Sequence, residues 1–201
     1  MKATGEVMAI GRTIEESLLK AIRSLEIGAD HLHLDKFDAW TADRLLRYIA
    51  DGTDDRIFAI AQLIRLGVDL GMIYDATRID MLFLDKLKHI TDLEQRVAAH
   101  PMDADTLREA KRTGFSDKAV ARLWGCAETE VFALRQAQQI RPVYKMIDSC
   151  ASEFDSYIPY FYATYEQENE SIVSDRKKVI VLGSGPIRIG QGVEFDYSTV
   201  H

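Results

Sequence analysis

A glycine-rich segment near the end of the chain restricts the fold most strongly: residues 178–197, KVIVLGSGPIRIGQGVEFDY. It begins with the continuous apolar run 179–182, which is typical of a strand buried on both faces of a parallel sheet. The glycines that follow predict a sharp turn into a helix. Such a strand needs neighbours, yet only residues 198–201 follow, too few for a crossover helix and a second strand. We therefore expect the chain to contain only the truncated start of an α/β domain.

The turn after this run could bind an anion, because glycines let several backbone N–H groups point toward one site. The candidate loop residues are Gly183, Gly185, Gly190, Gln191 and Gly192. The dinucleotide fingerprint GxGxxG would need glycine where the chain has Arg188, which argues against NAD or FAD. Arg188 can clamp a planar anion, and Glu194 can hold that arginine in place. The alternative is a salt bridge that only shapes the loop.

Upstream, apolar residues recur with helical spacing from about residue 13 to residue 139, which predicts a mainly α fold. Thr13 and Glu16 have the spacing of a capping box, and Asp103 and Ser116 are predicted N-caps. The predicted helices run from Thr13 toward Gly28, over Thr41–Ala50, Thr53–Leu66 and Thr77–Ala99, and as three short helices between Asp103 and Gln139 that are separated by Gly114 and Gly125, with a turn-rich piece around Gly71. The long helix is predicted to bury Ile79, Phe83, Leu87, Ile90 and Val97.

The three short helices leave two interpretations open. The spacing of a DNA-binding helix-turn-helix is present at Ala121, Gly125, Val131 and Leu134. However, the second helix of that motif begins with Glu128 and Glu130, which would repel phosphates, and Arg135 is its only cation. We therefore favour a small helical packing unit and predict no binding to nucleic acid.

After residue 139 the pattern becomes extended, with strand candidates at 143–147 and 160–165. The aromatic residues of the second candidate could be a stacking platform for bases, but no cations accompany them, so we favour burial at a domain boundary. These residues are Phe154, Tyr157, Tyr160, Phe161, Tyr162 and Tyr165. The polar residues 166–177 predict an exposed linker.

Acidic and histidine side chains gather in one predicted loop, at Asp30, His31, His33, Asp35 and Asp38. A metal site is one interpretation, but nothing at zinc spacing follows, and we favour solvated side chains with no metal. Cys126 and Cys150 form neither a disulfide framework nor a CxxC pattern, which predicts structural thiols.

Composition favours a cytoplasmic protein. No apolar run reaches the ~18 residues of a membrane span, and the first residues lack the cationic start and apolar stretch of a signal peptide. With 201 residues, one or two domains with a sizeable core are expected. A net charge of −7 favours solubility and weakens any general affinity for nucleic acid.

Several stretches resemble the large subunit of carbamoyl-phosphate synthetases. The family motif GPxRIGQGxEFDY is matched from Gly185 to Tyr197, at the opening of the second synthetase half. Met1–Glu26 resembles the end of the first ATP-grasp half, and Pro142–Lys145 (PVYK) and Thr164–Glu166 (TYE) resemble the module between the halves. The resemblance covers essentially the whole chain and is most specific at its two ends.

The resemblance implies three parts: residues 1–28, the end of the carboxyphosphate half; residues 29–170, a helical oligomerisation domain; and residues 171–201, the start of the carbamoyl-phosphate half, a truncated pre-ATP-grasp α/β domain. It implies an ATP-dependent carbon–nitrogen ligase that makes carbamoyl phosphate from bicarbonate, glutamine-derived ammonia and two ATP. Mg²⁺, K⁺ and a glutaminase small subunit are implied for that enzyme, in arginine or pyrimidine synthesis. Arg188 and Glu194 would lie on the route of its carbamate intermediate.

We expect these 201 residues alone to have no catalytic residues and no cofactor, because the nucleotide lobes of both halves are missing. Self-association through residues 29–170 is expected, since the helical stripes offer more apolar surface than one short bundle needs. A stripe on the first helix should normally pack on the absent ATP-grasp body and is expected to be exposed or misdocked: Ile14, Leu18, Ala21, Ile22 and Leu25. The alternative is a free-standing helical interaction or helix-turn-helix protein.

Overall fold

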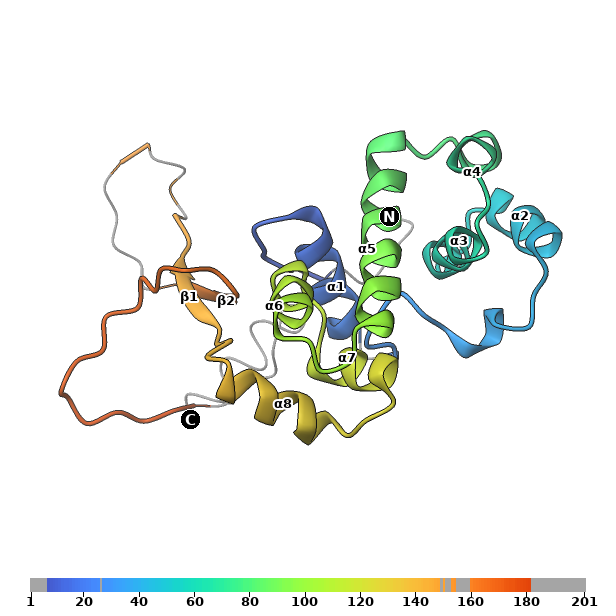
Figure 1. The fold of residues 1–201 in the computed structure, drawn as a ribbon. Helices are drawn as coiled ribbons and strands as arrows, with labels where there is room; N and C mark the ends of the chain where they lie inside the picture. Colours follow the sequence, from blue (N-terminus) through green and yellow to red (C-terminus); the bar gives the residue numbers. More distant parts are fainter. Residues whose placement is uncertain (1–6, 26, 149, 151–152, 155–159, 182–201) are drawn as a thin grey trace.

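The computed structural model describes residues 7–25, 27–148, 150, 153–154 and 160–181. Within them the chain forms eight α-helices, one short 3₁₀ helix and a two-stranded sheet (Figure 1). The mainly α fold predicted from the sequence is confirmed. The helices are α1 (Ile14–Ser24), η1 (Asp35–Phe37), α2 (Ala42–Ala50), α3 (Arg56–Arg65), α4 (Leu70–Thr77), α5 (Met81–Ala99), α6 (Ala104–Thr113), α7 (Asp117–Trp124) and α8 (Glu128–Ala137).

Most helices begin and end where the sequence predicts, because local hydrogen bonds define their ends. The side chains of Thr13, Asp103 and Ser116 accept backbone N–H bonds from the first turns of α1, α6 and α7. Gly114 and Gly125 end α6 and α7 in the left-handed conformation, with φ of 101° and 66°. The prediction of three short helices between residues 103 and 139 is therefore confirmed.

The turn-rich piece predicted around Gly71 is wrong, because the chain forms α4 there. The Asp69 side chain accepts the N–H of Gly71 at 2.8 Å and caps the helix. Gly71 lies in the first turn, and the buried Ile73 anchors the helix to the core. Packing of this kind outweighs the roughly 1 kcal/mol by which glycine disfavours a helix. As a result α5 begins at Met81, later than the predicted Thr77.

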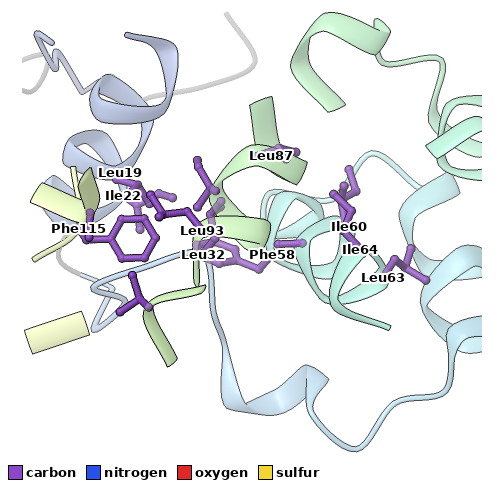
Figure 2. Close-up of a cluster of buried hydrophobic side chains, with 14 of the residues drawn as sticks. Leu19, Ile22, Leu32, Phe58, Ile60, Leu63, Ile64, Leu87, Leu93 and Phe115 are labelled. Carbon is purple, nitrogen blue, oxygen red and sulfur yellow. The ribbon is translucent and has the colours of Figure 1, made fainter. Parts of the chain in front are cut away.

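The long helix α5 is the centre of the fold (Figure 1). It contacts α1, α6 and α7 on one side and α3 and α4 on the other. Its buried residues are Leu84, Leu87, Ile90, Thr91, Leu93 and Val97. Figure 2 shows how side chains from α1, α3 and the loops join this helix in one core. Burial of each large apolar side chain contributes about 1.5–3 kcal/mol to folding.

The first helix is docked on this core, but only Ile22 of its predicted stripe is buried, so the expected exposure holds for part of that stripe. Leu19 and Ile22 are buried against the elements around α5. Ile14 and Leu25 keep about two fifths of their surface exposed, so only part of the predicted stripe faces solvent. The buried face of α1 also includes Glu15, whose carboxylate binds His89 Nδ1 of α5 at 2.8 Å. This contact joins α1 to α5 across the sequence.

A glycine lets α1 approach the end of α6 closely. A Cβ atom added to Gly114 would lie 2.9 Å from the Cα of Glu16. Arg23 strengthens the same contact by donating a hydrogen bond to the Gly114 carbonyl at 2.7 Å. Gly114 therefore serves both as a helix end and as the place where two helices meet.

The two extended candidates pair as an antiparallel ribbon, β1 (Val143–Met146) and β2 (Phe161–Thr164). Val143 lies opposite Thr164, and Met146 lies opposite Phe161. Asn169 and Glu170 close the other edge of β1, because the N–H of Tyr144 donates to Asn169 Oδ1 at 2.8 Å and that of Met146 donates to Glu170 Oε2 at 2.6 Å.

The aromatic segment is only partly buried. Phe154 and Tyr160 are exposed, which contradicts the burial predicted for them, and Tyr165 is half-buried against the helices. A two-stranded ribbon covers few of its own side chains, because no second layer packs on it. Tyr157 lies outside the described residues.

The strand predicted at residues 179–182 is not formed in its described part. Val179, Ile180 and Val181 have no strand conformation and are 62–89% exposed. A strand of a parallel sheet requires hydrogen-bonding neighbours, and the described residues supply none beside this segment. The polar linker before it, predicted as exposed, is mostly exposed.

Candidate functional site

The predicted anion loop lies outside the described residues. This holds for Gly183, Gly185, Arg188, Gly190, Gln191, Gly192 and Glu194. The assignment of Arg188 and Glu194 to a carbamate route therefore stays a prediction, and the candidate site must be sought in the helical part.

The strongest candidate there is an apolar surface where α4 meets the start of α5. Five large side chains are 37–53% exposed, and together they define what we call the α4–α5 corner: Met72, Tyr74, Met81, Leu82 and Phe83. Figure 1 shows α4 and the first turn of α5 joined by a short connection at one end of the molecule. A soluble monomer rarely exposes large apolar side chains in such a group, so this surface suits the binding of another protein surface.

Helix geometry explains why three successive apolar residues remain exposed. Asp80 caps α5 and accepts the N–H of Leu82 at 2.8 Å, so Met81, Leu82 and Phe83 form the first turn. The first residue of α5 to be fully buried is Leu84. Phe83 was predicted in the core stripe, and this assignment is wrong, because the buried face of α5 runs through Leu84 and Leu87.

Both signs of charge lie beside these apolar side chains. Arg78 ends α4 in the left-handed conformation with φ of 57° and pairs with Asp75 at 3.1 Å. Both side chains are at least 70% exposed. An exposed pair of this kind contributes little to stability, so it is free to exchange partners at an interface.

A second apolar surface lies along α1. Val7, Ala9, Ile14, Leu18 and Ala21 line an open groove of about 520 Å³ together with several polar residues. This groove is formed by the part of the predicted stripe that does not face the core. Its apolar side chains are smaller than those of the α4–α5 corner, because two of these five residues are alanines.

The described helical part also holds two buried charge clusters. In the first, the Arg65 guanidinium binds Glu94 Oε2 at 2.8 Å and 3.1 Å and the Leu32 carbonyl at 2.5 Å. Burial alone would raise the pKa of Glu94, but His31 and Arg65 outweigh it and lower that pKa to about 2. The Nε2 atom of His31 lies 3.6 Å from Glu94, too far for a hydrogen bond, so Arg65 is the stronger partner. This cluster joins the loop before α2 to α3 and α5.

The second cluster contains Arg135, the cation of the helix-turn-helix hypothesis. Arg135, the only cation of α8, is buried and binds Asp117 at 2.8 Å, and Lys111 binds the same carboxylate at 2.8 Å. The ring of Tyr165 lies over both cations. Arg135 is therefore engaged inside the fold and is not presented to a phosphate backbone. The arrangement agrees with a packing unit rather than with a recognition helix.

The fold places the candidate metal ligands of the predicted loop in two different environments. His31 is fully buried beside Glu94, whereas His33, Asp35 and Asp38 lie at the surface with ligand atoms within 4.8 Å of one another. Both ring nitrogens of His33 already have partners, because Nδ1 accepts from Arg122 at 3.0 Å and Nε2 contacts Asp38 at 2.9 Å. We propose no metal site at these three residues.

The sequence analysis did not predict the α4–α5 corner, although the sequence contains a signal for exposed apolar residues there. Three apolar residues follow directly after Asp80, a residue suited to an N-cap, and successive residues of one helical turn cannot all face one core. Recognising Asp80 as the cap would have placed two of them on the surface. In addition, none of the helices in the described part has the length and apolar character that crossing a bilayer requires.

Comparison with family models now assigns these features. Residues 6–139 match the model described as carbamoyl-phosphate synthetase large chain, oligomerisation domain, which spans α1 to α8 and includes the α4–α5 corner. Residues 175–201 match the carbamoyl phosphate synthase preATP-grasp domain. Both matches agree with the resemblance seen in the sequence, and neither favours the helix-turn-helix alternative. The chain therefore belongs to the family of carbamoyl-phosphate synthetase large chains, a family of ligases, and its helical part is the oligomerisation domain of that family.

Proposed function

We propose that this chain is the self-associating link between the two synthetase halves of a glutamine-dependent carbamoyl-phosphate synthetase. In this proposal its helical part joins copies of the large chain, and residues 175–201 begin the second half. The observation that carries the proposal is the match of residues 6–139 to an oligomerisation domain, combined with a bundle that exposes a group of large apolar side chains.

The wider enzyme would be a cytoplasmic ATP-dependent ligase that serves arginine or pyrimidine synthesis. It would receive ammonia from a glutaminase small subunit and use ATP with Mg²⁺ and K⁺. Arg188 and Glu194 would line the path of carbamate between its two halves. These statements follow from family membership, and each needs its own test in the complete enzyme.

Self-association is tested by sedimentation velocity of the 201-residue chain. If an interface of ordinary size buries roughly 800 Å² on each copy, the chain should form at least a dimer at micromolar concentration. A chain that sediments as a monomer over the whole micromolar range would contradict the proposal.

Catalytic inactivity of the chain is the second part of the proposal. Neither matched part is a nucleotide-binding lobe, so we expect no ATP hydrolysis and no carbamoyl phosphate, even with a glutaminase partner and Mg²⁺ present. A turnover above that of the buffer alone would show that these residues hold a complete active site.

A chain shortened at the proposed boundary after residue 28 is not suitable for these experiments. Removing residues 1–28 would delete Leu19 and Ile22 from the core and would take Glu16 away from Gly114. A shortened chain would then test folding rather than association. Point substitutions at the surface are the better instrument.

A further inference from the structure

We propose that the cavity between α6 and the segments 139–141 and 165–167 binds a phosphate dianion, either free or as the monoester of a small molecule. Three arginines line this cavity of about 250 Å³ and define what we call the arginine pocket: Arg108, Arg112 and Arg141. The inference goes beyond the proposed self-association and does not rest on it, because it concerns a small ligand and a different surface from the α4–α5 corner.

The lining of the arginine pocket is rich in hydrogen-bond donors. Each guanidinium carries five N–H groups in a planar fork, a shape that matches the oxygens of phosphate. The side-chain amides of Gln139 and Gln167 add further donors, and Glu166 is the single carboxylate among the described residues of the lining. Many donors and few acceptors suit a ligand that offers negative charge and several acceptor oxygens, as phosphate does.

Two of the three arginines are positioned by α6. Arg108 and Arg112 are four residues apart, so they lie on the same face of the helix. Leu107 and Ala110 are fully buried and fix α6 on the core. The backbone that carries both arginines is therefore in place before a ligand binds, which reduces the entropy lost on binding.

A turn after α8 positions the third arginine. Gln139 takes the left-handed conformation with φ of 54°, which is unfavourable for a residue other than glycine and persists only where the surrounding contacts hold it. The neighbouring Ile140 supplies such contacts, because its side chain is buried and its carbonyl accepts a hydrogen bond from Arg135 Nη1 at 3.2 Å. The turn brings Arg141 to the same cavity as the two arginines of α6.

The arginines have weak partners or none within the part of the chain that the structure describes. Arg108 pairs with Asp105 at 2.7 Å, but Asp105 is 92% exposed. Arg112 lies 3.5 Å from Glu166, and its side chain is more than half exposed. No described residue forms a hydrogen bond or an ion pair with the side chain of Arg141. Exposed pairs contribute little to stability, so the guanidinium groups can turn to a ligand of higher charge.

The charge around the pocket is positive, although the whole chain carries −7. Tyr165 lines the pocket, and the two cations over its ring, Lys111 and Arg135, share the carboxylate of Asp117. Five cations therefore face three carboxylates, those of Asp105, Asp117 and Glu166. An excess of positive charge in a concave site raises the local concentration of anions.

An adjoining cavity, which shares Arg108, Arg112 and Glu166 with the pocket, contains further acidic residues. These do not cancel the positive charge, because they have cations of their own. Glu109 binds Arg96 at 2.7 Å, and Glu15 lies 3.3 Å from Lys86.

Charge and size together favour phosphate over other anions. A carboxylate carries one charge and two oxygens, whereas a phosphate dianion carries two charges and at least three acceptor oxygens. Three guanidinium groups can therefore engage a phosphate more completely than a carboxylate. A cavity of about 250 Å³ admits a phosphate group with a small substituent but not a macromolecule.

Calorimetric titration of the 201-residue chain at constant ionic strength tests the site with three probes. We expect inorganic phosphate to bind saturably at millimolar concentration or below. Methyl phosphate distinguishes the two sources of the anion, because equal affinity admits monoesters and much weaker affinity restricts the site to free phosphate. Acetate should bind at least about tenfold more weakly than phosphate, since it has one charge and fewer acceptor oxygens.

Substitutions locate the binding site. Arg141→Gln should weaken phosphate binding at least about tenfold, because it removes charge-assisted hydrogen bonds. Arg47→Gln is the matched control: Arg47 is exposed on α2, and its loss should change the affinity less than about twofold. Glu166→Gln should tighten binding by about threefold, because it frees Arg112 and removes a carboxylate that repels the ligand. A gain in affinity cannot result from a poorly folded variant.

The outcomes separate this inference from the proposed function. Phosphate that does not bind saturably, or acetate that binds as tightly as phosphate, would overturn the assignment of the pocket. Equal affinities of Arg141→Gln and Arg47→Gln would show that the anion binds elsewhere on the chain. None of these results would affect self-association, which sedimentation velocity measures in a buffer without phosphate.

Discussion

The helical region, α1 to α8, and the later segment, residues 141–181, differ in how far their large apolar side chains are buried. In the helical region Leu93 and Phe115 are almost completely buried around α5. In the later segment Ile172, Val173 and the run 179–181 are 62–91% exposed, although their side chains are just as apolar. Hydrophobicity alone therefore does not decide which residues form a core.

The difference follows from where each kind of element finds its hydrogen bonds. A helix satisfies its backbone internally and needs only the apolar stripe of another helix to become stable. A strand leaves its N–H and C=O groups unpaired until a second strand lies beside it. The chain supplies eight helices within its described residues, but for the run 179–181 it supplies no neighbouring strand there.

The largest expected effect is on the free energy of unfolding, and one substitution in each region tests it. Phe115→Ala should lower the free energy of unfolding by about 3–5 kcal/mol, because it removes a buried ring and leaves a cavity. Ile180→Ala should change it by less than about 0.5 kcal/mol, since Ile180 is exposed. Urea unfolding at one fixed protein concentration measures both values. Similar losses for the two variants would mean that residues 179–181 are packed in solution.

The next effect concerns pH and the buried Arg65–Glu94 pair. The pKa of Glu94 falls from an ordinary 4.5 to about 2 in the folded chain, so its contribution is complete above pH 4.5 and is lost as the pH falls toward 2. This loss corresponds to about 3 kcal/mol of unfolding free energy. Burial also lowers the pKa of His31, so protonating this ring destabilises the fold in acid as well.

Unfolding curves measured from neutral pH down to pH 2 test this expectation. Glu94→Gln should be less stable than the natural chain at neutral pH, and the two curves should converge near pH 2. Glu168→Gln in the exposed segment is the control and should follow the natural chain at every pH, because Glu168 is 87% exposed. A constant difference between Glu94→Gln and the natural chain down to pH 2 would show that Glu94 does not titrate in this way.

The smallest effect should be confined to the ribbon. Glu170→Ala removes the acceptor of the Met146 N–H, which then faces solvent at the edge of β1. We expect faster hydrogen exchange at Met146 with no change in the exchange of the α5 core amides. Mass spectrometry or NMR would detect it. Faster exchange throughout α5 would mean that the ribbon and the helical region open together.

Most helices could be predicted because their signals are local. Thr13, Asp103 and Ser116 form their capping bonds within three residues, and Gly114 and Gly125 take up conformations that other residues disfavour. The exception, α4, has a glycine in its first turn, and it forms because Asp69 caps it and Ile73 is buried against the rest of the fold. Local spacing also fails to predict the exposure of Phe83. Its position fits the α5 stripe, although its side chain faces solvent.

The sequence by itself determined most helix ends, the mainly α fold and the family, because each depends on residues that are close together in the chain or on a motif that can be compared directly. Only the tertiary structure decided which apolar residues are left at the surface, how α1 docks, and which charges meet, as Arg65 meets Glu94 and Arg135 meets Asp117. Those outcomes depend on the packing of elements that are distant in sequence. The α4–α5 corner is such an outcome, since it consists of the side chains that remain exposed once α5 has buried its other face.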